Sequence, residues 1–395
     1  MIFRGVNYPN NIVNLVLSGG GVKGIAYVGV FETGEKCGYR WGNIAGVSAG
    51  ALAGSYAAAG YTGEELQKIM NEFDFGKIKL ENIPKMVPAV SRFMLHSNGL
   101  QTRASTSSIQ SYFEEQKDNQ FDIEWVTSPS SILRTQALSS NDRSGRVISI
   151  LKNVVKVSKE GCLFDGDYLE EWVYKVLRAK GIVTFGDLRY GIPDQVNPKG
   201  YKVRMSAVDA NRARIIVLPD DLAYYGIDPD RFEVAKAVRM STSVPFAFKP
   251  VELKKVEGNS YKTHYLIDGG VLDNFPFWLI NNPSNFTTMG FRLDGGKNNE
   301  LFSLDTPLNI LKGFIAAIHD IGKLDGVDKL KHVATIDIQK VSFMDFSLDS
   351  EEIAFLINAG KQAAQPMFNS LTASRNFGRA GLYRFMRGFG RHPFS

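Results

Sequence analysis

The sequence feature that most constrains the fold is a serine between small residues, in the motif Gly46-Val47-Ser48-Ala49-Gly50. The largely apolar residues 41–47 predict a strand, and the small residues 49–59 predict a helix that ends before Gly60. A chain that passes from strand to helix at one residue turns so sharply that only small residues fit beside it. This turn lifts the serine hydroxyl clear of the sheet, at a helix N-terminus whose unpaired amides favour negative charge. The motif predicts an α/β fold with Ser48 as a nucleophile, although by itself it also fits an ordinary turn before a helix.

A glycine-rich segment follows the short apolar run 12–17 and reads Ser18-Gly19-Gly20-Gly21-Val22-Lys23-Gly24. The run predicts a buried strand, and residues 24–34 predict the next helix. The glycine spacing matches a dinucleotide-binding turn, but that motif needs an acidic residue about 20 positions later, where this chain has Tyr39-Arg40-Trp41. As an oxyanion loop, the glycines would let backbone amides point at a tetrahedral oxyanion with no side chain in the way. Lys23 then either braces the loop or is a solvated lysine on a first helical turn.

A third motif, Asp268-Gly269-Gly270, follows the apolar residues 265–267, which predict another strand. Alone it is weak, because Asp-Gly is common turn chemistry. Beside the other two motifs it is informative, because an acyl hydrolase needs a nucleophile, a base and oxyanion donors. Ser48, Asp268 and the glycine loop would supply one each.

A conventional catalytic triad also needs a histidine between serine and acid. His264 lies four residues before Asp268, and on one extended strand the two would be about 13 Å apart, too far for the acid to orient the imidazole. The other histidines, His96, His319, His332 and His392, stand in no recognisable motif. We therefore expect a dyad in which Ser48 passes its proton directly to Asp268. A carboxylate is a weak base for a hydroxyl, so burial and short geometry must compensate.

Together these elements resemble the patatin-like phospholipase family. The resemblance extends to Met240-Ser241-Thr242-Ser243-Val244-Pro245-Phe246, to the continuation of the Asp268 motif through Asn274-Phe275-Pro276, and to residues 345–364 as a closing helix. It implies a three-layer α/β/α fold with a central mostly parallel sheet, a Ser48–Asp268 dyad and an oxyanion hole from the glycine loop. It also implies hydrolysis of lipid acyl esters with no metal or other cofactor. Lys23 is a small departure, since the family often has arginine there.

The domain organisation expected from the sequence is one catalytic domain over residues 1–370, because no linker or repeat interrupts it. Residues 64–180 read as a helical and loop insert of unassigned topology, and residues 371–395 as a tail rich in arginine and aromatic residues. Further strands are expected at residues 201–208, 214–218, 286–293 and 333–338, and helices at residues 233–240 and 308–318.

Location and partners are predicted from what the sequence lacks and from its charge. Cys37 and Cys162 stand far apart with no metal-ligand spacing, and no stretch approaches the roughly 20 apolar residues of a membrane span. We expect a cytoplasmic or peripheral membrane protein, with export by a signal-independent route left open. The net charge of +5 and the arginine-rich tail fit contact with anionic lipid at the membrane surface, where the lipid substrate lies. No nucleic-acid partner is expected, because no recognition motif accompanies these arginines. An activator and a non-catalytic membrane- or partner-binding role stay open as alternatives, although the intact motifs speak against the second.

Overall fold

The structure is a computed structural model that describes residues 11–74, 152, 155, 158–159, 162, 164, 166–280, 286–294, 331–338, 341 and 348–388, with side chains of the last helix described to residue 374. The first part of the chain forms β1 (Ile12–Leu17), the 3-10 helix η1 (Gly21–Ile25), α1 (Ala26–Lys36), β2 (Arg40–Val47), α2 (Ala49–Ala58) and α3 (Gly63–Glu72). The middle part forms α8 (Asp167–Ala179), η5 (Phe185–Leu188), β3 (Val203–Asp209), β4 (Arg214–Leu218), η6 (Asp220–Tyr225), η7 (Pro229–Arg231) and α9 (Val234–Ser241). The last part forms β5 (Val251–Glu257), β6 (Ser260–Asp268), η8 (Gly269–Val271), η9 (Phe277–Leu279), β7 (Thr287–Asp294), β8 (His332–Asp337) and α11 (Ser350–Gly388).

The described strands form one eight-stranded sheet in the order β5-β6-β3-β2-β1-β7-β8, with β4 also paired to β3. The five strands β3, β2, β1, β7 and β8 are parallel. The strands β4, β5 and β6 join by antiparallel pairing. The sheet is therefore mostly parallel, and the fold is α/β. Because parallel strands end at the same edge of a sheet, the turns that follow β1 and β2 lie next to each other.

The core lies on both faces of this sheet, because successive side chains of a strand point to opposite faces. On β1, Val13, Leu15 and Leu17 join the main cluster, to which the described α-helices contribute. Val16, between them, belongs to a smaller cluster on the other face with Phe275, Leu279 and Ile280. The buried apolar run of β1 is thus explained by packing on both sides, as is usual for a central parallel strand.

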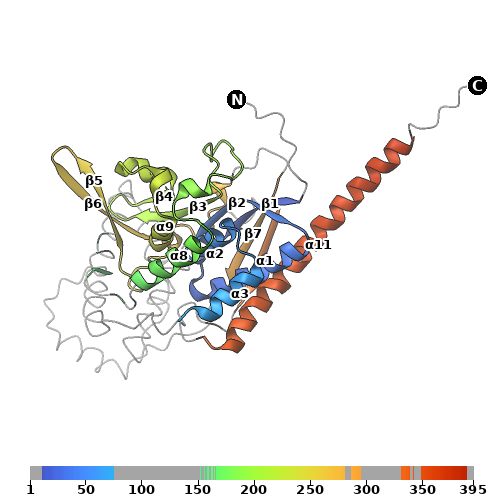
Figure 1. The fold of residues 1–395 in the computed structure, drawn as a ribbon, viewed down its shortest axis with the longest axis horizontal. Coiled ribbons are helices and arrows are strands. Elements are labelled where there is room, and N and C mark those ends of the chain that lie inside the picture. The colour runs from blue at the N-terminus through green and yellow to red at the C-terminus, as the bar shows by residue number, and fades with distance from the viewer. Residues whose placement is uncertain are drawn as a thin grey trace, which may run out of the picture.

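Helix α11 packs along α1 and continues beyond the sheet (Figure 1). The backbones of the two helices come close at one glycine in each helix. A Cβ on Gly29 of α1 would lie 1.9 Å from the carbonyl oxygen of Ile357, and a Cβ on Gly360 of α11 would lie 1.9 Å from the carbonyl oxygen of Ala26. No real Cβ fits at such distances, so these two glycines set the approach of the helices.

The strands predicted at residues 12–17, 41–47, 201–208, 214–218, 265–267, 286–293 and 333–338 correspond to β1, β2, β3, β4, β6, β7 and β8. The predicted helices after the two glycine motifs and at residues 233–240 correspond to α1, α2 and α9. The ends of the insert form α3 and α8, and its remainder lies largely outside the described residues, as do the helix expected at residues 308–318 and His96, His319 and His392. Helix α11 continues past residue 371, where the tail was expected to begin, and contains Pro366.

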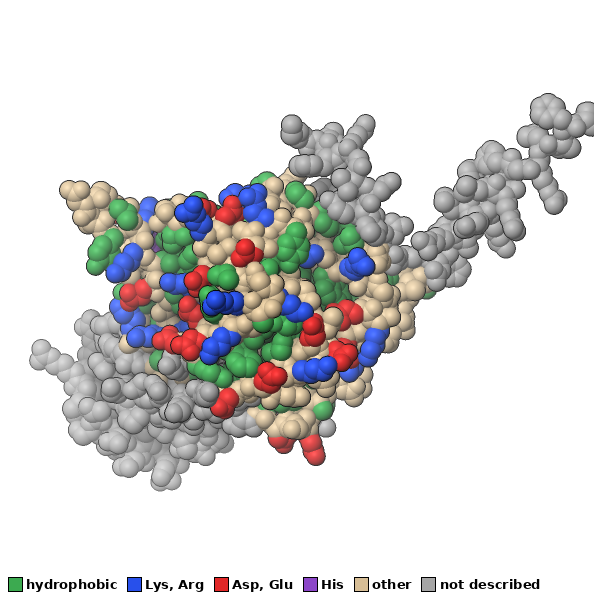
Figure 2. Space-filling model, in the orientation of Figure 1, with side chains coloured by type: hydrophobic (Ala, Val, Ile, Leu, Met, Phe, Trp, Pro, Cys, Tyr) green, Lys and Arg blue, Asp and Glu red, His purple; other side chains and the backbone are tan. Residues whose placement is uncertain are grey.

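Basic and acidic side chains are interspersed over the described part of the face seen in Figure 2. Some of them pair, as Lys68 does with Glu64 and Lys180 with Glu65, both at 2.9 Å or less. Such exposed pairs contribute little to stability. The excess of positive charge is not gathered on this face, so it provides no single-sign field there.

Candidate active site

Ser48 occupies a strained turn between β2 and α2. Its backbone has φ 53° and ψ −123°, a conformation that residues other than glycine rarely adopt. The neighbours must be small: a Cβ on Gly46 would lie 2.4 Å from the carbonyl oxygen of Gly50, and a Cβ on Gly50 would lie 2.2 Å from that of Leu17. The predicted tight turn is therefore present, and these close contacts explain its two glycines.

The Ser48 amide is held by a side chain from α9. Ser48 N–H donates to Ser241 Oγ at 3.0 Å, and the Ser241 hydroxyl donates to the carbonyl oxygen of Ser206 on β3 at 2.7 Å. All three residues are buried. The Ser241 hydroxyl thus gives the Ser48 amide an acceptor at a point where the chain no longer pairs with a neighbouring strand. The same hydroxyl links the turn to β3 in the central sheet.

Asp268 ends β6 on the other side of β3 from Ser48. Val47, just before the serine, pairs with Ser206, while Asp268 pairs with Ala207. The two side chains therefore start at nearly the same level of β3, one from each flanking strand. The Asp268 amide donates to the carbonyl oxygen of Ser243 at 2.9 Å. The last residue of α9 therefore contacts Ser48, and the residues just after α9 contact Asp268.

The Asp268 carboxylate is buried and only partly hydrogen-bonded. Oδ1 accepts the amide of Gly270 at 2.7 Å, while Oδ2 has no hydrogen-bond partner among the described residues. Burial raises the pKa of Asp268 to about 7, and the Ser48 side chain and the Gly270 amide lower it only in part. A carboxylate of this kind is a far better proton acceptor near neutral pH than an ordinary aspartate. The Ser48 side chain lies close enough to the Asp268 carboxylate to lower its pKa, but Oδ2 accepts no hydrogen bond from the described residues.

Gly269 and Gly270 allow the chain to turn directly after the carboxylate. A Cβ on Gly269 would lie 2.6 Å from the carbonyl oxygen of Ser206, and one on Gly270 would lie 2.8 Å from Oδ1 of Asn274. Both residues are buried in the short 3-10 helix η8. They bring the backbone against β3 and leave room beside the Asp268 side chain.

The glycine loop lies beside Ser48 and is joined to Asn274. Gly19 N–H donates to the Asn274 carbonyl at 3.3 Å, and Asn274 Nδ2 donates to the Gly19 carbonyl at 3.4 Å. A Cβ on Gly19 would lie 3.0 Å from Cβ of Ser48. The Lys23 amide also has an acceptor, because it donates to the carbonyl oxygen of Gly20. Within the described residues, the amides of Gly20, Gly21 and Val22 have no acceptor, and Gly20 and Gly21 stand at the start of η1.

Gly20 and Gly24 serve the packing of this loop. A Cβ on Gly20 would lie 2.5 Å from the Leu293 side chain on β7, and one on Gly24 would lie 2.7 Å from Cβ of Ala49. Gly24 therefore lets η1 pack tightly against the first residue of α2. The Ala49 amide, at the first position of α2, has no hydrogen-bond acceptor among the described residues.

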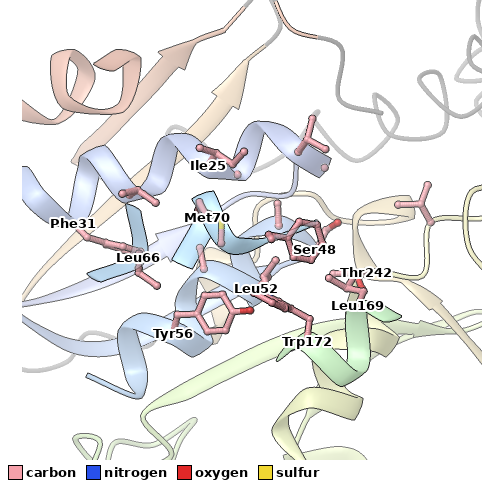
Figure 3. A pocket seen from close by; sticks show the side chains of 18 of the residues that line it. Ile25, Phe31, Ser48, Leu52, Tyr56, Leu66, Met70, Leu169, Trp172 and Thr242 are labelled. Carbon is pink, nitrogen blue, oxygen red and sulfur yellow. The ribbon is translucent and has the colours of Figure 1, made fainter. Parts of the chain in front are cut away.

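An apolar cavity of about 120 Å³ opens beside Ser48. Its lining comes from η1, α1, α2, α3, α8 and the segment after α9, and is mostly aliphatic and aromatic. In Figure 3, Ser48 lies at one side of the cavity and Phe31 and Leu66 at the other. A serine next to such a space is placed to act on a molecule with an apolar chain.

His264 has a partner outside this site. Its Nδ1 lies 2.8 Å from Oδ2 of Asp209, which also accepts the Tyr225 hydroxyl at 2.7 Å. These groups are buried at the C-terminal end of β3. The imidazole is thus held by Asp209, in agreement with the expectation that Asp268 does not orient it.

The comparisons with known proteins give the family. The family model described as Patatin-like phospholipase matches residues 15–280. YqhO of Bacillus subtilis strain 168, described as an uncharacterized protein, is 32% identical over 360 residues, which cover 89% of this chain and 96% of YqhO. The chain belongs to the patatin-like phospholipase family.

Two solved structures also align with this family member. VipD from Legionella pneumophila aligns with a TM-score of 0.46 at 19% identity, over 92% of this chain and 67% of VipD. ExoU from Pseudomonas aeruginosa, in a complex with SpcU, aligns with a TM-score of 0.38 at 14% identity, over 91% of this chain and 52% of that one. The family assignment depends on the family model and on YqhO.

Sequence reasoning found the family motifs but gave no role to Ser241 or Asn274. Both lie in segments whose resemblance to the family was noted, which was the available signal. What they do depends on contacts with residues far away in the chain, Ser48 for one and Gly19 for the other.

No group of three or more His, Cys, Asp and Glu side chains is placed to hold a metal ion in the part of the chain that the structure describes. None of the helices described has both the length and the apolar character needed to cross a bilayer.

Proposed function

We propose that this protein is a serine acyl hydrolase that cleaves ester bonds of membrane lipids, of phospholipase A or lysophospholipase type, with Ser48 as nucleophile and Asp268 as its base. Family membership supports lipid acyl hydrolysis in general. The single observation that carries the finer proposal is the pairing of a strained, buried serine with a buried carboxylate whose pKa is raised to about 7. Among the described residues no charged side chain stabilises the ionised Asp268, so the carboxylate has a strong tendency to take a proton.

The first half of the reaction transfers the acyl group to Ser48. The Ser48 hydroxyl passes its proton to Oδ2 of Asp268 while Oγ bonds to the ester carbonyl carbon, and the carbonyl electron pair moves onto oxygen. When the carbonyl re-forms, the bond to the alcohol oxygen breaks, and the departing alcohol takes the proton from Asp268. The product at this stage is an acyl-Ser48 ester.

The second half uses water in place of the lipid alcohol. Water gives a proton to Asp268 and attacks the acyl-Ser48 carbonyl, and the Ser48 oxygen then leaves and regains that proton. The balance is one ester and one water converted into one fatty acid and one alcohol. Both carboxylate and serine return to their starting states.

The negative charge that develops on the carbonyl oxygen needs backbone donors. We assign this role to the amides of Gly20 and Gly21 and to the Ala49 amide, because these keep no acceptor within the described residues. The Ser48 amide is excluded because it donates to Ser241. Removing one such donor typically costs a factor of about 100 to 1,000 in kcat.

The apolar cavity would hold the acyl chain. It opens at Ser48 and is lined mainly by aliphatic and aromatic side chains, so transfer of an acyl chain from water into it is favourable by roughly 0.8 kcal/mol per buried methylene. A lipid docked in this way has its ester at the serine and its headgroup outside.

The test is fatty-acid release from mixed phosphatidylcholine and phosphatidylglycerol vesicles and from detergent-dispersed lysophosphatidylcholine. Ser48→Ala is compared with Ser55→Ala, which removes a buried hydroxyl from the same helix; Ser55 donates to the carbonyl of Ala51. We expect Ser48→Ala to lose at least about a thousandfold in kcat and Ser55→Ala to keep its activity once folded. Release of fatty acid by Ser48→Ala at the wild-type rate would refute the assignment of the nucleophile.

A failure of all variants to release fatty acid has its own follow-up. The assay is repeated with added eukaryotic and bacterial cell extracts, since an activator stays an open expectation. If release is still missing while the wild type sediments with the vesicles, the protein is a membrane-binding module of this fold and the proposal is wrong.

A further inference from the structure

The hairpin of β5 and β6 projects from the edge of the sheet at which Ser48 lies. Among the described strands, β6 pairs with β3 only from Leu266 to Asp268, and residues 260–265 pair with β5 alone. β3 runs parallel to β2, which ends just before Ser48, and β6 runs antiparallel to β3. The free end of the hairpin therefore passes the C-terminal end of β3, and the five residues from Leu266 to Tyr261 extend it by about 17 Å. Figure 1 shows this end of the hairpin and the C-terminal end of α11 at opposite sides of the molecule.

The base of the hairpin is fixed to the rest of the fold. The His264 ring packs edge-on against the rings of Tyr225 and Tyr224, with centroids 5.2 and 6.0 Å apart. Leu253, which pairs with His264 across the hairpin, is buried as well. These contacts hold one face of the hairpin, so its tip is presented at a defined position beyond the sheet.

The tip of the hairpin carries two exposed apolar side chains. Val256 is 74% exposed and Tyr261 is 61% exposed, the highest values among the large hydrophobic residues that the structure describes. The two residues lie directly opposite each other, near the turn at Gly258-Asn259. Edge strands are usually protected from association by charged side chains, and that purpose gives no reason for an apolar pair. The exposure of the pair has a reason if the tip contacts an apolar phase.

Lysine side chains flank this apolar pair. Lys254 Nζ lies 4.7 Å from the centroid of the Tyr261 ring. Lys255 lies directly opposite Lys262 in the register of the hairpin, an arrangement that destabilises a strand pair because the charges are alike. In Figure 2, hydrophobic and basic side chains lie together over this hairpin. An anionic surface next to the tip would relieve the repulsion between the lysines.

The acidic residues of β5 do not cancel this charge. Glu257 lies 3.6 Å from Lys255, and Glu252 lies 3.8 Å from Lys159, so each glutamate has a lysine of its own. Within the part of the chain that the structure describes, the two remaining lysines of the hairpin form no ion pair. The hairpin therefore keeps two positive charges without an acidic partner, beside two exposed apolar side chains.

We propose that the tip of the β5–β6 hairpin is a docking surface for an anionic lipid bilayer, with Val256 and Tyr261 at the level of the headgroups. The side chains of Lys254 and Lys262 contact lipid phosphates. A tyrosine ring suits the membrane interface because one end of it is apolar and the other is polar, and each lysine near an anionic leaflet strengthens binding. Docking at the tip turns the edge of the sheet that carries Ser48 toward the lipid. The inference goes beyond the proposed hydrolysis, since binding to the bilayer needs no catalysis.

The experiment measures sedimentation of the Ser48→Ala protein, called the parent here, with vesicles, so that no lipid is consumed during the assay. One set of vesicles is phosphatidylcholine alone, and the other contains equal parts of phosphatidylcholine and phosphatidylglycerol. The charge variant is Lys254→Gln with Lys262→Gln. Its matched control is Lys175→Gln with Lys199→Gln, which removes the same charge from two exposed lysines outside the hairpin. The unfolding midpoint of each protein establishes that it is folded.

On the mixed vesicles we expect the charge variant to bind about 25-fold more weakly than the parent, about fivefold for each lysine, and the control pair to bind nearly as the parent does. Val256→Thr with Tyr261→Thr keeps residues that favour strands but loses apolar area, and should weaken binding about five- to tenfold. Phosphatidylcholine alone should bind the parent weakly. Added salt should reduce the difference between the charge variant and the parent.

Tyr261→Trp reports whether the tip enters the bilayer. Its emission, after subtraction of the parent spectrum, should shift to shorter wavelength on the mixed vesicles and be quenched by brominated phosphatidylcholine. The inference is overturned if the charge variant binds like its control, if the threonine variant binds like the parent, or if the emission of Tyr261→Trp does not change. If the parent does not bind the mixed vesicles at all, the inference is also wrong, and the tip is left for a protein partner.

Hydrolysis by the same variants with Ser48 intact separates this inference from the proposed function. Both hairpin variants should cleave the soluble ester 4-nitrophenyl butyrate at the wild-type rate and release fatty acid from mixed vesicles more slowly. If the wild type hydrolyses nothing but vesicle binding depends on the hairpin, the hydrolase proposal fails and the docking surface stands. If both hairpin variants release fatty acid from vesicles at the wild-type rate, the docking surface is wrong and the hydrolase proposal stands.

Discussion

Replacing Asp268 by asparagine should abolish hydrolysis and, above pH 7, make the protein more stable. Asparagine has nearly the same size and still offers an oxygen to the Gly270 amide, but it neither ionises nor accepts the Ser48 proton. Activity is expected to fall by at least about 100- to 10,000-fold, the usual contribution of a general base. The stability effect has the opposite sign, because the wild type holds a carboxylate where burial disfavours its charge.

The magnitude follows from the pKa of Asp268, which burial raises from 3.8 to about 7. A pKa raised by folding contributes stability below the unfolded-state pKa, and this stability is lost as pH rises through the folded-state pKa. Each unit is worth about 1.36 kcal/mol, so the wild type loses roughly 3 kcal/mol between pH 4 and pH 7 from this group alone. The Asp268→Asn variant does not have this pH-dependent loss of stability. Its advantage over the wild type should be about 3 kcal/mol larger at pH 8 than at pH 5.

Urea unfolding of both proteins at pH 5 and pH 8 measures this difference, in which the other titrating groups cancel. Asp187→Asn serves as a control of opposite sign. The Asp187 carboxylate accepts the amides of Thr184 and Val183, and the Thr184 amide above all lowers its pKa, so its replacement should cost stability at pH 8 and less at low pH. If Asp268→Asn and the wild type show the same pH dependence, Asp268 does not titrate near pH 7 and its assignment as a neutral-pH base loses its physical ground.

Three further predictions concern the same fold. The kcat/KM of the wild type should rise about tenfold per unit of pH below 7 and level off above, since only the ionised carboxylate accepts a proton; a pH–rate profile on one soluble ester checks this. Ser241→Ala leaves the nucleophile's amide without its acceptor and should cost about 1 to 3 kcal/mol in urea unfolding, with a lowered kcat. Gly360→Ala places a Cβ against the Ala26 carbonyl and should cost about 1 to 3 kcal/mol or more, whereas Ala359→Gly beside it should cost only about 1 kcal/mol.

The sheet and its central site motifs could be predicted because their signals are local. A short apolar run that ends at glycines is recognisable without knowledge of its neighbours, and residues 12–17, 41–47 and 265–267 are of this kind. Parallel strands bring their C-terminal turns to one edge, so the glycine loop and Ser48 could be expected to meet there.

The part that could not be predicted depends on contacts between distant segments. That β3 lies between Ser48 and Asp268 follows from strand order, which no local pattern encodes. The Ser241 relay joins residues 193 positions apart through one hydroxyl, and serine has no sequence signature for such a contact. Trp172 lines the cavity because α8 packs against α2. The apolar face of α8 predicts that this face is buried, but it does not predict which element covers it.

Two costs to stability meet at this site. Ser48 adopts a backbone conformation that disfavours any side chain, at about 1 to 3 kcal/mol, and Asp268 is buried with one oxygen unpaired. Glycine in place of the first and asparagine in place of the second would relieve both, so packing alone gives no reason for either residue. Two independent rules of local consistency are violated at adjoining side chains, and such a coincidence indicates function at that point.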